Sequence, residues 1–249
     1  LCKQYCRGAL ARPLARHLTH YLRISGETYL QTARQQECGV ILVATHSVFV
    51  PGLFSSILRQ LGYGELMTYA GQQILQQQPA LYHAFQRYFR TEEKALLIAK
   101  FLSLQMDVAQ RRLKQGGIVW IAADGGSGHR TWPISVLGSQ RNFSTGFAEL
   151  ALQSGAPVIP LRHAIGATGE VEITFLPPLD AGGATTKRTE RIQHLLQQYV
   201  DFLEDTWRLD PANVALSHMK HFLAQDHAGQ AAPTEAPLQQ PLTPVMITE

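Results

Sequence analysis

The sequence is poor in cysteine and in charge, and it has no hydrophobic run long enough to cross a membrane. Its 249 residues include three cysteines and 16% charged residues, whereas hydrophobic residues make up 45%. Three cysteines cannot all pair, which excludes a disulfide-based scaffold and favours a reducing compartment. The longest apolar run, residues 39–54, is interrupted by polar residues and by Pro51. It falls short of the roughly 18–20 apolar residues of a membrane helix, so we expect the chain to be soluble or membrane-peripheral.

Acidic residues are absent from the first 24 positions, which contain the basic residues Lys3, Arg7, Arg12, Arg16 and Arg23. Leucines at helical spacing separate these bases, so we expect residues 1–36 to form a basic amphipathic helical segment. Such a helix could lie on an anionic membrane surface, or it could pack its leucines on the domain and expose its charges. The net charge of +3 is too small to imply nucleic-acid binding.

The hydrophobic pattern beyond residue 36 alternates between strands and helices, which predicts an α/β fold. We expect a single domain over residues 37–226, with a mixed, mostly parallel central sheet flanked by helices. Continuous apolar runs predict buried strands at 39–45, 118–123 and 157–161, the first of them parallel and central. Residues 66–70 predict a second short strand, and 170–176 predict an edge or half-exposed strand. Helices are expected at 50–61, over most of 72–113, near 145–152, at 186–207 and at 211–223. Residues 227–249, rich in proline and glutamine, predict a flexible tail.

Two polar residues follow predicted strands, at the sheet edge where α/β proteins bind ligands. His46 follows the first buried strand and could act as a general base, or it could only cap the next helix. Asp124 follows the strand at 118–123 and could orient a histidine, bind a substrate hydroxyl or form an Asx-turn. Backbone N–H groups of the glycine-rich segment 125–128 could bind an anion. The spacing of cysteine and histidine indicates no metal site.

The order of several segments resembles that of the bacterial lipid A biosynthesis acyltransferases, the lauroyl and myristoyl transferases of the lysophospholipid acyltransferase superfamily. After the strand that ends at His46, these segments are Leu113–Asp124, Ile134–Gly138, Ser144–Ala151 and Ser154–Leu161. The resemblance covers about residues 37–222 and implies a glycerolipid acyltransferase-like fold.

This family uses a His-x4-Asp/Glu motif, in which the histidine takes a proton from an acceptor hydroxyl that then attacks an acyl thioester. Here His46 is present, but Pro51 occupies the position of the acid. Proline can neither carry charge nor orient a histidine through its side chain. Asp124 matches a family carboxylate position that helps build the acceptor site, and it is our candidate for the missing partner of His46.

The resemblance implies that the protein transfers a fatty acyl group from an acyl carrier protein or coenzyme A thioester to a lipid or glycolipid hydroxyl. His46 and Asp124 are the expected catalytic residues. The expected substrate-binding residues are Ser47, Phe49, Gly125, Gly126, Arg130 and Arg141. No cofactor is expected beyond the thioester co-substrate, and no nucleic acid. The expected location is the cytoplasmic side of the inner membrane, peripherally bound, or the cytoplasm.

Pro51 leaves two alternatives open. The protein could be a catalytically weak or inactive relative that binds an acyl chain, a lipid or a partner protein. It could also be a different transferase whose acceptor makes the motif acid dispensable.

Overall fold

The computed structural model describes residues 21–46, 66–70, 96–98, 102–125, 130–166, 170–183 and 186–214. The predicted helix at 50–61, most of the basic N-terminal segment and the predicted tail lie outside these residues. So does most of the predicted helix at 211–223, whose first residues form a 3-10 turn, Pro211–Asn213.

A seven-stranded sheet forms the centre of the fold, in the order β1-β9-β8-β2-β5-β3-β4. Five neighbouring strands, from β8 to β4, run parallel to one another, and β9 pairs antiparallel with β8. The strands are β1 (Leu22–Ser25), β2 (Val40–Ala44), β3 (Leu66–Ala70), β4 (Leu96–Ile98), β5 (Ile118–Ala122), β8 (Val158–Ile165) and β9 (Val171–Phe175). The predicted α/β fold with a mixed, mostly parallel sheet is therefore confirmed.

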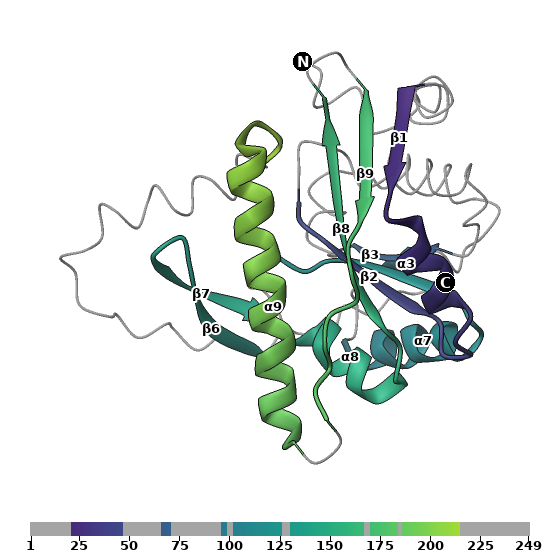
Figure 1. The fold of residues 1–249 in the computed structure, drawn as a ribbon. Helices are drawn as coiled ribbons and strands as arrows, with labels where there is room; N and C mark the ends of the chain where they lie inside the picture. Colours follow the sequence, from purple (N-terminus) through teal and green to yellow (C-terminus); the bar gives the residue numbers. More distant parts are fainter. Residues whose placement is uncertain are drawn as a thin grey trace, which may run out of the picture.

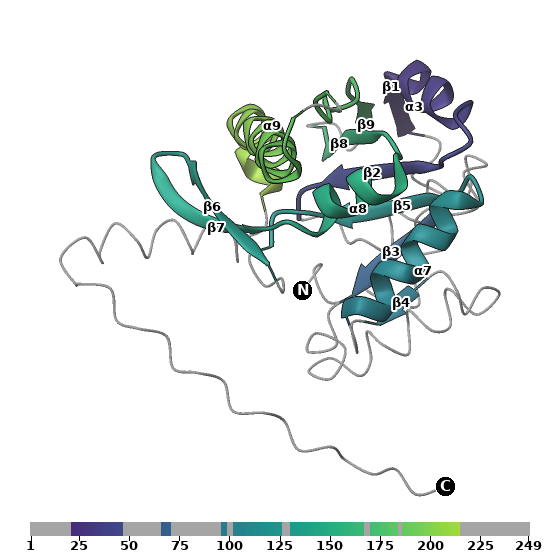
Figure 2. The same ribbon diagram turned by 90° about the horizontal axis from the view of Figure 1, so that it is seen from below.

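Strand β2 lies at the middle of this sheet and is buried on both faces, as its continuous apolar sequence predicts. Its side chains alternate between two cores. Ile41 and Val43 pack in the core formed with helices α7 (Leu102–Lys114), α8 (Gly146–Ser154) and α9 (Arg188–Leu209). The intervening side chains pack in the core of the opposite face, which includes residues of α3 (Glu27–Arg34). Among the described helices α9 is the longest, with 22 residues, and Figures 1 and 2 show it next to α8.

Two expectations from the sequence need correction. Leu22–Ser25 is not part of a basic helix but strand β1, paired in parallel with β9, so the domain begins before residue 37. Leu96–Ile98 is a strand within the region predicted to be helical. In both cases pairing with another strand overrides the local pattern. Of the two alternatives for 170–176, the half-exposed strand is confirmed, since β9 has an alternating burial pattern and β1 lies outside it.

A hairpin that the sequence analysis did not predict, β6 (Thr131–Val136) and β7 (Ser139–Ser144), extends from the sheet beside α9. Its turn consists of Leu137 and Gly138, which both have positive φ (48° and 79°), as a two-residue hairpin turn of type I′ requires. The Leu137 N–H donates a hydrogen bond to Glu204 Oε1 of α9 (2.8 Å), which fixes the turn to the helix. Among the helices described, none has the length and apolar character to span a bilayer.

Candidate active site

His46 and Asp124 meet because two parallel strands end side by side. Strands β2 and β5 are paired with Ala44 opposite Ala122. Two residues further on, the same register brings His46 opposite Asp124. The carboxyl ends of parallel strands are the edge where open α/β sheets bind ligands, so this pair lies where the architecture places a site.

The carboxylate of Asp124 holds His46 at two atoms. Asp124 Oδ1 lies 2.5 Å from His46 Nδ1, and Asp124 Oδ2 accepts a hydrogen bond from the His46 backbone N–H (2.8 Å). The Asp124 side chain is completely buried, whereas the His46 side chain is 40% exposed. A buried carboxylate therefore fixes the orientation of an imidazole that solvent or a ligand can reach.

The environment of this pair raises the pKa of His46 above its ordinary value of 6.5. Burial by itself lowers the pKa, because it penalises the charged imidazolium. The negative charge of Asp124 and its hydrogen bond outweigh this effect, while the positive charge of Arg141 opposes them. The pair is thus arranged to stabilise an imidazolium, the form that a general base adopts after taking a proton.

Arg141, a predicted substrate-binding residue, lies beside the pair. From strand β7 its Nη2 donates a hydrogen bond to the backbone carbonyl of Asp124 (2.5 Å), and its guanidinium lies over the ring of Phe143, 5.4 Å from the centroid. Burial lowers the pKa of Arg141, and the charge of Asp124 opposes that effect. Arg141 brings a partly desolvated positive charge to the site, suited to an anionic group of a substrate.

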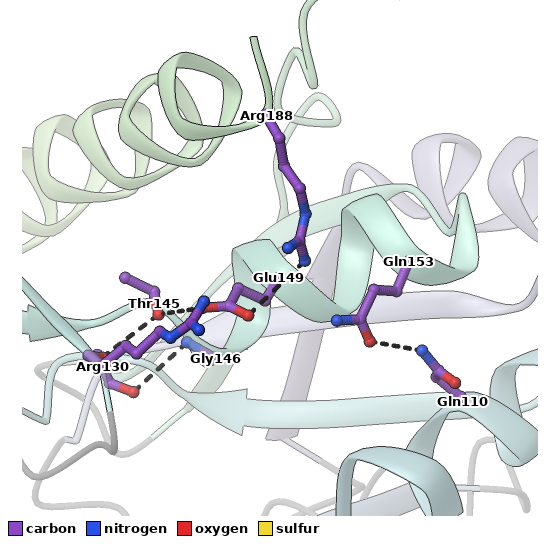
Figure 3. A network of polar contacts seen from close by, with 8 residues as sticks. Gln110, Arg130, Thr145, Gly146, Glu149, Gln153 and Arg188 are labelled. Atoms are coloured by element: carbon purple, nitrogen blue, oxygen red, sulfur yellow. Dashed lines mark hydrogen bonds and ion pairs between the residues drawn. The ribbon is translucent and has the colours of Figure 1, made fainter. Parts of the chain in front are cut away.

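Arg130, the other predicted arginine, points instead toward helix α8. Its Nη1 lies 3.8 Å from Glu149 Oε1, and Arg188 of α9 approaches the second oxygen of the same carboxylate (3.7 Å), as Figure 3 shows. The Thr145 hydroxyl donates a hydrogen bond to Glu149 Oε1 (2.8 Å). Arg130 and Arg188 are 70% and 51% exposed, so solvent weakens these pairs. The structure therefore gives Arg130 a contact at the start of α8.

Gly125 immediately follows Asp124, and its carbonyl accepts a hydrogen bond from the Ser144 backbone N–H (3.1 Å). Among the residues that the structure describes, none would have a heavy atom within 4 Å of a Cβ added at this glycine. Ser47, Phe49 and Gly126, the remaining predicted substrate-binding residues, lie outside the described residues, as does Pro51.

Two buried residues near the pair were not predicted as site residues. His163 of β8 is 7% exposed. Its pKa is lowered to about 4, mainly by burial and further by the charge of His46, while Asp124 opposes the shift. Tyr199 of α9 is fully buried and donates its hydroxyl hydrogen to the carbonyl of Ala44 (2.9 Å). The sequence offered only weak signals: Tyr199 belongs to the apolar face of a predicted helix, and His163 lies two residues beyond a predicted strand.

A shallow groove of about 430 Å³ lies between the hairpin and the N-terminal half of α9. It is lined by residues 132–135 of β6 together with Gln193, His194 and Gln197, and includes neither His46 nor Asp124. Within the part of the chain that the structure describes, no group of three histidine, cysteine or acidic side chains could bind a metal ion.

Comparison with known proteins gives a matching family, and a search of solved structures gives a protein that aligns with much of the chain. The sequence model of the bacterial lipid A biosynthesis acyltransferases matches residues 9–207. A solved structure, the 1-acyl-sn-glycerophosphate (LPA) acyltransferase PlsC from Thermotoga maritima, is 16% identical to this chain. The alignment covers 78% of this chain and 77% of that one, with a TM-score of 0.42. Among curated proteins, none matches significantly.

Proposed function

The chain belongs to the bacterial lipid A biosynthesis acyltransferase family and is an acyltransferase of lipid substrates; on this premise, we propose that His46 is its general base and that Asp124 orients this base. The observation that supports the proposal is the contact of 2.5 Å between His46 Nδ1 and Asp124 Oδ1. When Nδ1–H donates to the carboxylate, the base acts through Nε2, on a ring that is partly exposed. Asp124 then supplies the carboxylate that Pro51 cannot.

In the proposed reaction, His46 Nε2 takes the proton of an acceptor hydroxyl while the hydroxyl oxygen attacks the carbonyl carbon of an acyl thioester. A C–O bond forms, and the C–S bond of the resulting tetrahedral intermediate breaks. The thiolate leaves and takes the proton back from the imidazolium, so the products are an ester and a free thiol. Asp124 holds the imidazole in the required tautomer and stabilises its charged form.

The donor in this proposal is an acyl carrier protein or coenzyme A thioester, and the acceptor is a lipid or glycolipid hydroxyl. Arg141 is suited to bind an anionic group of a substrate, because its positive charge lies beside Asp124 and is partly desolvated. We propose substrate-binding roles also for Ser47, Phe49, Gly125 and Gly126. Arg130 would have to leave its solvent-weakened pair with Glu149 to bind a substrate in the same way. No cofactor beyond the thioester is proposed. The reaction would take place in the cytoplasm or at the cytoplasmic side of the inner membrane, where the basic N-terminal segment could contact anionic lipid.

The test is acyl transfer by the purified protein. A fatty acyl carrier protein thioester and an acyl coenzyme A are supplied in parallel, with a bacterial lipid extract as acceptor, and the release of thiol and the acylated lipid are measured. We expect His46→Ala to lower the rate by about 10²- to 10⁴-fold, the usual contribution of a positioned base. His194→Ala is the matched control, because His194 is a half-exposed histidine of α9 paired with Asp180. Equal rates for His46→Ala and the wild type would refute the assignment of the base.

Pro51 favours a second candidate, a catalytically weak member of the family that mainly binds an acyl chain, a lipid or a partner protein. Pro51→Glu separates the two candidates. If His46 lacks only its motif acid, this substitution should raise a transfer rate that is close to background in the wild type. If Asp124 already serves His46, the wild type is active and Pro51→Glu brings no gain.

A further inference from the structure

Helix α9 contacts the strand that leads into the site through one buried hydroxyl group. Tyr199 lies in the middle of this helix and is fully buried. Its hydroxyl donates a hydrogen bond to the carbonyl oxygen of Ala44, at a distance of 2.9 Å. Ala44 is the last residue of β2, two positions before His46. The hydroxyl therefore contacts the strand at the point where the chain leads into the proposed base.

The same carbonyl also joins the two strands that carry the proposed catalytic pair. The backbone N–H of Ala123, the residue before Asp124, donates a hydrogen bond to Ala44 O (3.0 Å). A carbonyl oxygen has two lone pairs, so these two bonds satisfy it completely. This backbone hydrogen bond joins β2 and β5 immediately before His46 and Asp124, and Tyr199 donates to the same acceptor from outside the sheet.

The Tyr199 ring is held firmly enough to define where its hydroxyl lies. Its centroid is 5.3 Å from that of Phe147 in α8 and 5.9 Å from that of Phe202 in α9, both in tilted arrangements. Such aromatic contacts restrict the ring and add to the area that it buries. Burial also raises the pKa of Tyr199 well above its ordinary value of 10.0, with the charge of Asp124 acting in the same direction. The hydroxyl thus keeps its proton, and remains a donor, throughout the physiological pH range.

We propose that Tyr199 is a positioning residue, which fixes the spacing of His46 and Asp124 by holding the Ala44 carbonyl. The contact of 2.5 Å between His46 Nδ1 and Asp124 Oδ1 depends on the relative position of the two strand ends. Those ends are joined by the hydrogen bond from Ala123 to Ala44, and Tyr199 is the side chain that anchors this bond to the helical layer. The effect of Tyr199 on turnover rests on the proposed function, but its effect on the pair does not.

Tyr199→Phe is the direct test, because it removes the hydroxyl and keeps the ring. The first readout is the pKa of His46, obtained from NMR titration of the imidazole resonance that is missing in His46→Ala. We expect this pKa to fall in Tyr199→Phe, since a looser pair weakens the two effects of Asp124 that raise it while burial still lowers it. The second readout is turnover. We expect kcat to fall about 10- to 100-fold, with KM changed less than about twofold, because small misplacements of a catalytic group affect the transition state most.

Leu30→Ala is the matched control, since it trims the core on the opposite face of the sheet from Tyr199. It should lower the thermal stability and leave both the pKa of His46 and the kcat near their wild-type values. If the pKa of His46 in Tyr199→Phe matches that in the wild type, or if Leu30→Ala shifts it equally, the proposal is wrong. If Tyr199→Phe yields too little folded protein, the measurements are repeated with Leu137→Asn added to every protein, because this substitution relieves a left-handed turn position.

The two proposals fail in different ways. If His46→Ala keeps full activity while Tyr199→Phe shifts the pKa of His46, the assignment of the base fails and the positioning role stands. If His46→Ala abolishes transfer while Tyr199→Phe leaves the pKa of His46 and kcat unchanged, the base stands and the positioning role fails.

Discussion

Asp124→Asn tests whether the carboxylate of Asp124, and not merely its shape, serves His46. Asparagine has nearly the same size as aspartate, but one of its two oxygens is replaced by an NH2 donor. In the protein both oxygens accept: Oδ2 from the His46 backbone N–H and Oδ1 from the ring nitrogen Nδ1. The substitution therefore changes the hydrogen bonding of the pair while leaving its packing in place.

Neither orientation of the new amide restores the pair. If the amide oxygen accepts from the His46 backbone N–H, the NH2 group faces Nδ1, which must then accept, and the ring proton moves to Nε2. The imidazole is then in the wrong tautomer to take a proton from the acceptor. If the amide is turned over, two donors face each other at the backbone N–H. By comparison with the equivalent change in a serine protease triad, we expect kcat to fall by about 10⁴.

The pH dependence gives a second, independent measure. In the wild type the activity should rise with pH through a pKa above 6.5, because the pair raises the pKa of His46 and the base must be neutral. In Asp124→Asn the charge of the carboxylate is lost, whereas burial and Arg141 remain and both lower this pKa. The acid limb of the residual activity should therefore move to below pH 6.5.

The assay is the pH profile of kcat/KM for thioester-dependent transfer, in the wild type and in the variant. Glu204→Gln is the matched control. It makes the same carboxylate-to-amide change in α9, where Glu204 accepts a hydrogen bond from the backbone of the hairpin turn. It should leave the acid limb where it is in the wild type. An Asp124→Asn enzyme that keeps more than a tenth of wild-type kcat, or an acid limb that stays above pH 6.5, would contradict the proposed role of Asp124.

Two further predictions concern stability. His163 has a pKa of about 4 in the folded protein and an ordinary value of 6.5. The unfolded chain therefore binds the proton first, and this histidine removes up to about 3 kcal/mol of stability as the pH falls from 6.5 to 4. Urea unfolding across this range should show a shallower loss for His163→Gln, and parallel curves would refute the effect. Leu137 has a φ of 48° and is 41% exposed, so Leu137→Asn should relieve the left-handed strain at little cost in burial. We expect a gain of about 1 kcal/mol and a melting temperature higher by roughly 2–4 °C, with no gain for Leu137→Ala.

The sequence by itself determined the main strands, the long C-terminal helix and the two polar residues at the strand ends. Continuous apolar runs identify β2, β5 and the start of β8, because such runs have both faces buried. The sequence also contains a spacing that indicates the pairing of His46 with Asp124. His46 lies seven residues after Gly39, and Asp124 lies seven residues after Gly117. Since β2 and β5 are paired from Val40 and Ile118, equal run lengths bring the two polar residues level.

Tertiary structure alone decided which distant groups meet. Strand β1 takes its conformation from pairing with β9, 149 residues away at the Ser25–Thr174 contact, and no local period encodes that partner. Arg130 and Arg141 look alike in the sequence, yet the strand of Arg141 carries its guanidinium to Asp124, while Arg130 contacts Glu149. Tyr199 looks like any core residue of an amphipathic helix until α9 packs against the sheet and brings its hydroxyl to Ala44. The physical reason is that periodicity reports which face of an element is buried, whereas the atom that a buried group contacts depends on how whole elements pack.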